Sequence, residues 1–131
     1  MAGAAALVVI TFLLATTPPA YAGKSQRVRF QKGRTTAILK GRLPKDDYDY
    51  DAYIIRAKAR QQLTVHLASP DAKARLVVYA ADLGPTEDMI TPEGQDPLRD
   101  WSGPLPVSGD YSIQVYTGGE GGSYTLEVTI R

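Results

Sequence analysis

The chain has 131 residues, of which 44% are hydrophobic and 22% are charged, a composition typical of one globular domain. It carries 15 Lys and Arg and 14 Asp and Glu, and this net charge of +1 argues against a nucleic-acid-binding protein, which presents a strongly basic face. No cysteine occurs, so the chain forms no disulfide and has no cysteine that could be lipidated.

The first 22 residues have the features of a secretory signal peptide. They contain no Asp, Glu, Lys or Arg, and the apolar run LVVITFLL (residues 7–14) is far shorter than the roughly 20 residues that cross a bilayer. The sequence AYA (residues 20–22) has the small-x-small pattern of a cleavage site. We therefore predict a signal peptide over residues 1–22, cleaved after Ala22, and one domain over residues 23–131 with no membrane attachment.

Alternation of apolar and polar residues with a period of two predicts β-strands along most of that domain. RVRFQK (27–32) is expected to form a first hairpin with TTAILKG (35–41) through Gly33. Further strands are expected at QLTVHLA (62–68), YSIQVY (111–116) and YTLEVTI (124–130). AYIIRAK (52–58) and ARLVVYAA (74–81) are apolar on both faces, which is typical of strands in the middle of a sheet.

Residues 82–107 contain eight prolines and glycines that interrupt regular structure, and a long surface excursion with one short strand near residues 98–101 is expected there. No segment after residue 22 has helical spacing. The pattern predicts an all-β, antiparallel β-sandwich of about seven to eight strands. The residues expected in its core are Tyr53, Ile55, Leu63, Val65, Val78, Ile113, Val115, Leu126 and Val128.

Charge is distributed unevenly along the domain. Residues 23–62 hold 11 Lys and Arg against 4 Asp, a net of +7, whereas residues 63–131 hold 4 basic and 10 acidic residues, a net of −6. We expect strands of the two halves to become neighbours and neutralise each other, in preference to a field that steers a charged partner.

No catalytic residue and no cofactor are predicted. The one histidine, His66, falls on the outward face of its strand, and Ser108 has neither a nucleophile elbow nor a second histidine to activate it. The glycines of GGEGGS (118–123) lie between two strands, whereas a phosphate-binding loop precedes a helix. The acidic run KDDYDYD (45–51) lacks the glycine and distal glutamate of a calcium loop, so a solvated turn is favoured over a metal site, although calcium binding stays open.

The sequence resembles a known family in five segments: RVRFQKGRTTAILKG, YDYDAYIIRAKARQQLTVHL, LVVY, LPVSGDYSIQV and SYTLEVTI. Together they are similar to the periplasmic inhibitors of g-type lysozyme, and the resemblance covers nearly all of residues 23–131. The strand order also resembles, more loosely, the bacterial pre-peptidase C-terminal domain, a β-sandwich accessory module of secreted enzymes.

The first resemblance implies a periplasmic protein that is not an enzyme and whose partner is a lysozyme, with the g-type favoured. It implies that Tyr48 and the serine of the SGxY turn, Ser108, enter the glycan-binding cleft. The predicted lysozyme-binding residues are Tyr48, Asp49, Tyr50, Asp51, Ser108, Gly109 and Tyr111. The family's arginines in the last hairpin have no counterpart here, because YTGGEGGSY offers only Glu120.

Such a site is chemically sensible. A lysozyme uses a carboxylic acid in its cleft, and hydroxyls on a small rigid turn can bind that carboxyl and exclude substrate. The interpretation requires the fold to bring Tyr48 and Ser108 to the same end of the sandwich. The alternative is a non-catalytic carbohydrate- or protein-binding module, which typically accompanies a catalytic domain; we expect no second domain after Arg131, which favours the inhibitor. The oligomeric state is not predicted.

Overall fold

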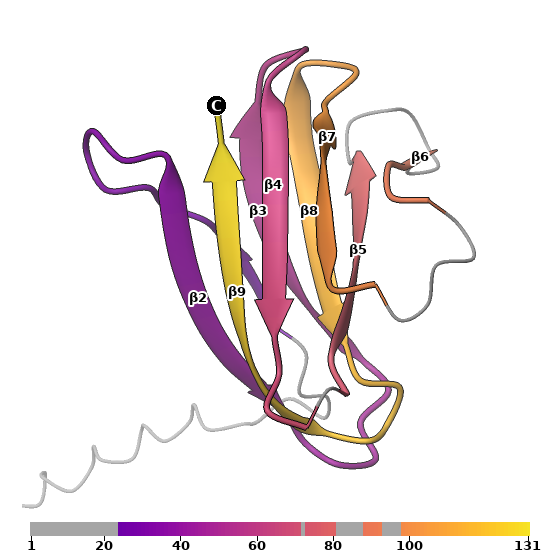
Figure 1. Ribbon diagram of the computed structural model, residues 1–131. Coiled ribbons are helices and arrows are strands. Elements are labelled where there is room, and N and C mark those ends of the chain that lie inside the picture. Colours follow the sequence, from indigo (N-terminus) through magenta and orange to yellow (C-terminus); the bar gives the residue numbers. More distant parts are fainter. Residues whose placement is uncertain (1–23, 72, 81–87, 93–97) are drawn as a thin grey trace, which may run out of the picture.

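The computed structural model describes residues 24–71, 73–80, 88–92 and 98–131, which form strands and loops arranged as two packed sheets (Figure 1). The predicted signal peptide lies outside these residues, as do residues 82–87 and 93–97 of the predicted surface excursion. The described part contains no helix that could cross a bilayer. The strands in chain order are β1 Ser25–Arg27, β2 Thr36–Leu43, β3 Tyr50–Ala57, β4 Gln62–Ala68, β5 Arg75–Ala80, β6 Asp88–Met89, β7 Asp100–Pro104, β8 Gly109–Tyr116 and β9 Gly122–Ile130.

The sheets are built by a chain that repeatedly crosses between them. One sheet has the order β1-β3-β8-β5-β6 and the other β2-β9-β4-β7. Except for β5 and β6, consecutive strands lie in different sheets, so each connecting loop runs over an end of the sandwich. All pairings are antiparallel apart from β1 with β3. The predicted β-sandwich is confirmed. The described residues form nine strands where about seven to eight were expected, since two very short strands, β1 and β6, add to the count.

The core lies between the facing sides of the two sheets, and the predicted strand phase is confirmed. All nine residues expected there are buried, with exposed fractions of 0 or 1%. Along β4 buried and exposed residues alternate strictly, as period-two patterning requires. Phe30, Trp101 and Ile130 pack against the edge of this core.

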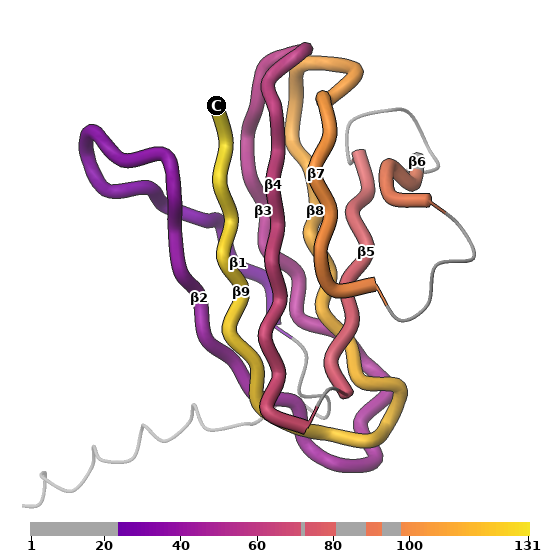
Figure 2. Tube along the Cα trace, viewed as in Figure 1, coloured from indigo at the N-terminus to yellow at the C-terminus, as the bar shows by residue number. Residues whose placement is uncertain are grey.

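The predicted first hairpin is wrong. Gly33 does make a tight turn, with φ of +77° and a 2.8 Å hydrogen bond from Arg34 N to Gln31 O. However, β1 pairs in parallel with β3, and residues 28–35 then carry the chain to the other sheet, a path visible in Figure 2. Val28 and Phe30 are apolar because this crossing segment packs on the core, and their alternation therefore imitates that of a strand.

Candidate functional site

The fold places the two predicted contact loops at opposite ends of the sandwich. In the β3–β8 pairing, Tyr50 lies opposite Tyr116 and Ala57 opposite Gly109. Tyr48 therefore precedes one end of β3, and Ser108 lies beside the other end, about 23 Å away at the usual rise of about 3.3 Å per residue. The prediction that both residues share one end is wrong, because strand pairing joins Ser108 to the far end of β3.

The end that carries Tyr48 is formed by residues 44–49, 69–71, 73–74 and 117–121, at the bottom of Figure 1. We call it the Tyr48 end. Tyr48 has an exposed fraction of 76% and Tyr50 of 46%, which is unusual for large aromatic side chains. The ring of Tyr48 lies on the backbone of Gly119, where a Cβ atom would come within 2.5 Å of two ring carbons. The Tyr48 ring is thus exposed on one face and packed against Gly119 on the other.

Backbone contacts fix the two loops to each other. Asp46 N donates to Gly119 O at 2.7 Å, and a Cβ on Gly121 would lie 2.7 Å from the backbone nitrogen of Lys45. Thr117, fully buried, accepts a 3.0 Å hydrogen bond from Gly121 N through its Oγ1. The glycines of this turn adopt positive φ, which other residues rarely do. The GGEGG loop therefore supports the loop that carries Tyr48.

A buried polar cluster ties the start of β3 to β9 in the opposite sheet. Tyr124 donates a 2.5 Å hydrogen bond to Asp51 Oδ2, and the hydroxyls of Tyr53 and Tyr124 are 2.6 Å apart. Lys24 N donates to the other carboxylate oxygen of Asp51 at 3.1 Å. Burial, and then the hydrogen bonds to Asp51 and Tyr53, raise the pKa of Tyr124 far above its ordinary value of 10.0. The hydroxyl therefore stays protonated and donates.

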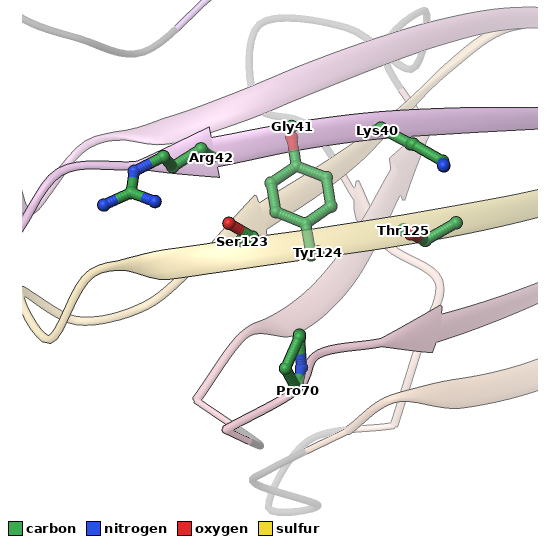
Figure 3. A pocket seen from close by; sticks show the side chains of 7 residues that line it. All are labelled: Lys40, Gly41, Arg42, Pro70, Ser123, Tyr124 and Thr125. Atoms are coloured by element: carbon green, nitrogen blue, oxygen red, sulfur yellow. The ribbon is translucent and has the colours of Figure 1, made fainter.

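Tyr124 fits because its register partner is Gly41. A Cβ on Gly41 would lie 2.3 Å from the Tyr124 hydroxyl oxygen, and Figure 3 shows the ring directed toward that glycine. Both residues line a shallow depression of about 420 Å³ on the sheet that contains β2 and β9. Its other lining residues are Lys40, Arg42, Pro70, Ser123 and Thr125.

The SGDY turn is stabilised from within. Ser108 Oγ accepts a 2.9 Å hydrogen bond from Ala59 N. The hydroxyl of Tyr111 donates to Val107 O at 2.5 Å and accepts from Val107 N at 3.1 Å, so the buried ring closes the loop that precedes it. Gly109 has φ of +148°, which favours glycine. These contacts account for the turn's sequence without a partner.

The predicted contact residues therefore divide by exposure. Tyr48, Asp49, Tyr50 and Ser108 are exposed, whereas Asp51, Gly109 and Tyr111 are buried. The buried residues do not contact a partner directly, and they affect binding only through the neighbours that they hold in place. Asp51 has the same strand parity as Tyr53 and Ile55, a signal that predicts an inward side chain and was obscured by the neighbouring aspartates.

The four aspartates of residues 46–51 do not converge on a metal. Asp47 Oδ1 accepts from Asp49 N at 2.8 Å, while Asp51 points into the core. No group of metal-ligating side chains is present in the described ranges. His66, as expected, is exposed, and it contacts Asp100 on the neighbouring strand.

No protein-family model matches the chain. A curated relative, an inhibitor of g-type lysozyme from Escherichia coli K12, is 32% identical over 110 residues, covering 82% of this chain and 77% of the relative. The crystal structure of PliG, a periplasmic inhibitor of g-type lysozyme from Aeromonas hydrophila, matches with a TM-score of 0.65 and 32% identity, over 86% of this chain and all of that one.

A more distant structure shows how widely the architecture occurs. The pre-peptidase C-terminal domain of a Bacillus anthracis collagenase has a TM-score of 0.56 at 13% identity, over 88% of this chain and all of that domain, a likeness of fold alone. The identity of the first two relatives to this chain, 32%, is well above that of the collagenase domain. The chain belongs to the family of periplasmic inhibitors of g-type lysozyme.

Proposed function

We propose that this protein is a periplasmic inhibitor of g-type lysozyme, without catalytic activity of its own, and that its Tyr48 end enters the glycan-binding cleft of the enzyme. The observation that carries the site is the exposure of Tyr48, 76%, on a ring held by Gly119. Family membership supports the lysozyme as partner and the periplasm as location. Blocking the cleft would protect the cell's peptidoglycan.

A prearranged aromatic residue suits this task. Tyr and Trp dominate the binding energy of protein interfaces because a rigid ring buries a large area at little entropic cost. The Tyr48 ring already packs against Gly119 on one side, which lowers the entropy lost when it binds. Its hydroxyl can hydrogen-bond a carboxyl group of the cleft, the group on which glycoside hydrolysis depends.

The surrounding charges favour a partner whose cleft has a basic rim. Five exposed or half-exposed acidic residues lie at the Tyr48 end, against two basic ones in the same loops: Asp46, Asp47, Asp49, Asp71 and Glu120 against Lys45 and Lys73. Lys73 approaches Glu120 at 3.8 Å, which leaves an acidic excess. Complementary charge at an interface mainly accelerates association.

The Ser108 turn lies too far from Tyr48 to enter the same narrow cleft. We assign Ser108, Gly109 and Tyr111 a supporting role in the fold, and Asp51 a role in holding the start of β3 beneath Tyr50. The contact residues of the proposed site are thus Tyr48, Asp49 and Tyr50.

The test is the inhibition of purified lysozymes in a cell-wall turbidity assay. The protein is expected to inhibit a g-type lysozyme, and Tyr48→Ala is expected to weaken inhibition about five- to a hundredfold, the usual effect of removing an aromatic anchor. Ile38→Ala is the matched control, because Ile38 is 63% exposed but lies on the outer face of β2. Equal inhibition by both variants would exclude the Tyr48 end, and no inhibition by the parent protein would exclude the function.

A further inference from the structure

The end of the sandwich opposite Tyr48 is strongly basic. It consists of residues 28–35, 57–62 and 104–109, at the top of Figure 1, and these segments contain five basic residues and no acidic residue. All five basic side chains are exposed: Arg29, Lys32, Arg34, Lys58 and Arg60. We call this surface the basic end.

The expectation that strands of the two halves become neighbours and neutralise each other is confirmed only in part, because the charges of the basic end lie in loops beyond the paired strands. Asp110, which borders the basic end, binds Arg27 at 2.9 Å and Arg56 at 3.5 Å. Among the described residues no carboxylate lies within ion-pair distance of Lys58, Arg60 or Arg34. The positive half of the sequence therefore produces an exposed basic surface at this end in addition to the ion pairs of Arg27 and Arg56.

The basic end also contains a concave surface with room for more than one sugar unit. A depression of about 510 Å³ is lined by Arg56, Ala57, Lys58, Gln61 and Ser108. Ser108 Oγ uses a lone pair to accept from Ala59 N, which leaves its hydroxyl proton able to donate. Cations beside a hydroxyl and an amide are the groups that recognise a sugar bearing an acidic substituent.

The spacing of the two basic loops indicates an extended ligand. The loop of residues 28–35 is joined to β9 by a 2.9 Å hydrogen bond from Ile130 N to Thr35 O, and β9 is paired with β4, which follows residue 61. The loop and the β3–β4 turn are therefore two strand spacings apart, about 10 Å. One small anion does not bridge that distance, whereas a chain with repeated negative charges does.

An anionic membrane fits this surface less well. The exposed large hydrophobic residues of the described part are Ile38, Tyr48 and Tyr50, and none of them lies at the basic end. Proteins that bind bilayers at their surface combine basic residues with an apolar face that enters the lipid.

We propose that the basic end binds an anionic polysaccharide whose sugars carry carboxylate or phosphate groups, and that it does so independently of the Tyr48 end. Such binding would retain the protein at a polyanionic glycan while Tyr48 stays free for a lysozyme. The inference does not depend on the proposed inhibition, because it concerns other residues and another ligand.

The test measures binding of fluorescein-labelled oligogalacturonate and dextran phosphate, which separate carboxylate from phosphate, with neutral dextran as the uncharged comparison. The parent protein is expected to bind at least one anionic glycan at low salt and to release it at about 0.5 M salt, where exposed charges are screened. The double variant Lys58→Gln, Arg60→Asn is expected to bind at least about tenfold more weakly. Asparagine is chosen because Arg60 has φ of +75°, which asparagine tolerates.

The matched control is Lys40→Gln, Arg42→Gln, which removes two exposed cations from the depression near the other end. Its glycan affinity is expected to stay within about twofold of the parent's. Equal losses in the two double variants would overturn the proposal, because net charge would then explain binding. Failure to bind either anionic glycan, or binding only to vesicles containing anionic lipid, would also overturn it. Lysozyme inhibition, measured in parallel, reports separately on the Tyr48 end.

Discussion

Tyr48 and Gly119 form a contact in which a glycine determines the position of an exposed aromatic ring. Gly119 has φ of +90°, and a Cβ built on it would lie 2.5 Å from Cε1 and Cζ of the ring. The two residues are far apart in sequence and meet because Asp46 N binds Gly119 O, which joins their loops. Gly119 thus allows the turn between β8 and β9 to support the ring of Tyr48, on which the proposed inhibition depends.

Gly119→Ala is expected to displace the Tyr48 ring and to weaken lysozyme inhibition about tenfold, while unfolding stability falls by roughly 1 to 3 kcal/mol from the strained backbone. The control is Gly33→Ala, since Gly33 also has positive φ, +77°, but has nothing within 4 Å of the added Cβ. That variant should lose stability without losing inhibition. Inhibition constants that changed equally in both would show that strain alone is responsible.

Ser108→Ala tests whether the SGDY turn is a support or a contact. The change removes the acceptor of the Ala59 N–H and is expected to lower the melting temperature by a few degrees, as loss of one local hydrogen bond does in a small domain. Inhibition of g-type lysozyme should stay the same. A normal melting curve combined with weaker inhibition would instead place Ser108 in the interface.

The strands could be predicted from the sequence because burial follows parity, and the core residues from Tyr53 to Val128 were found in that way. The pairing of β1 with β3 and the position of Ser108 relative to Tyr48 could not. Both depend on where the chain crosses from one sheet to the other. Such a crossing produces no periodic pattern of apolar residues that could be recognised in the sequence. A crossing segment such as residues 28–35 also buries apolar residues and is mistaken for a strand.

The candidate site was predicted in part. Tyr48 and Tyr50 are exposed as expected, but the residues that hold them, Gly119 and Tyr124, act through contacts between distant segments. Asp51 was grouped with the solvated aspartates although its parity with Tyr53 indicated an inward side chain. The neighbouring aspartates indicated a solvated side chain, whereas the strand phase indicated a buried one. The buried hydrogen bond from Tyr124 to Asp51 agrees with the strand phase.

Tyr124→Phe is expected to destabilise the fold by roughly 1 to 3 kcal/mol, because Asp51, 1% exposed, then loses the donor to its Oδ2 atom. In a denaturant titration, Asp51→Asn combined with Tyr124→Phe should cost less than the sum of the two single changes, since the residues act as a pair. Additive costs would mean that the bond contributes no coupling. Asp49→Asn, at an exposed neighbouring position, should leave stability nearly unchanged.

Asp110 makes the stability of the domain depend on pH. Arg27 donates to both of its carboxylate oxygens, at 3.2 and 2.9 Å, and this hydrogen bonding holds the pKa of Asp110 below its ordinary value of 3.8. A lowered folded-state pKa means that the ion pair contributes its stability above pH 3.8 and loses it as the pH falls through the folded value.

The contribution should be modest, under about 1 kcal/mol, because the Arg27 side chain is 51% exposed and the pair is screened by salt. Arg27→Gln is expected to move the Asp110 pKa back toward 3.8, as followed by NMR titration of its carboxyl carbon, with Arg56 retaining part of the shift. The stability difference between the parent and Asp110→Asn should be constant near neutral pH and diminish below pH 3.8. A difference that instead grew on acidification would mean that ionised Asp110 destabilises the fold. This result would contradict the ion pairs by which Asp110 on β8 binds Arg27 on β1 and Arg56 on β3.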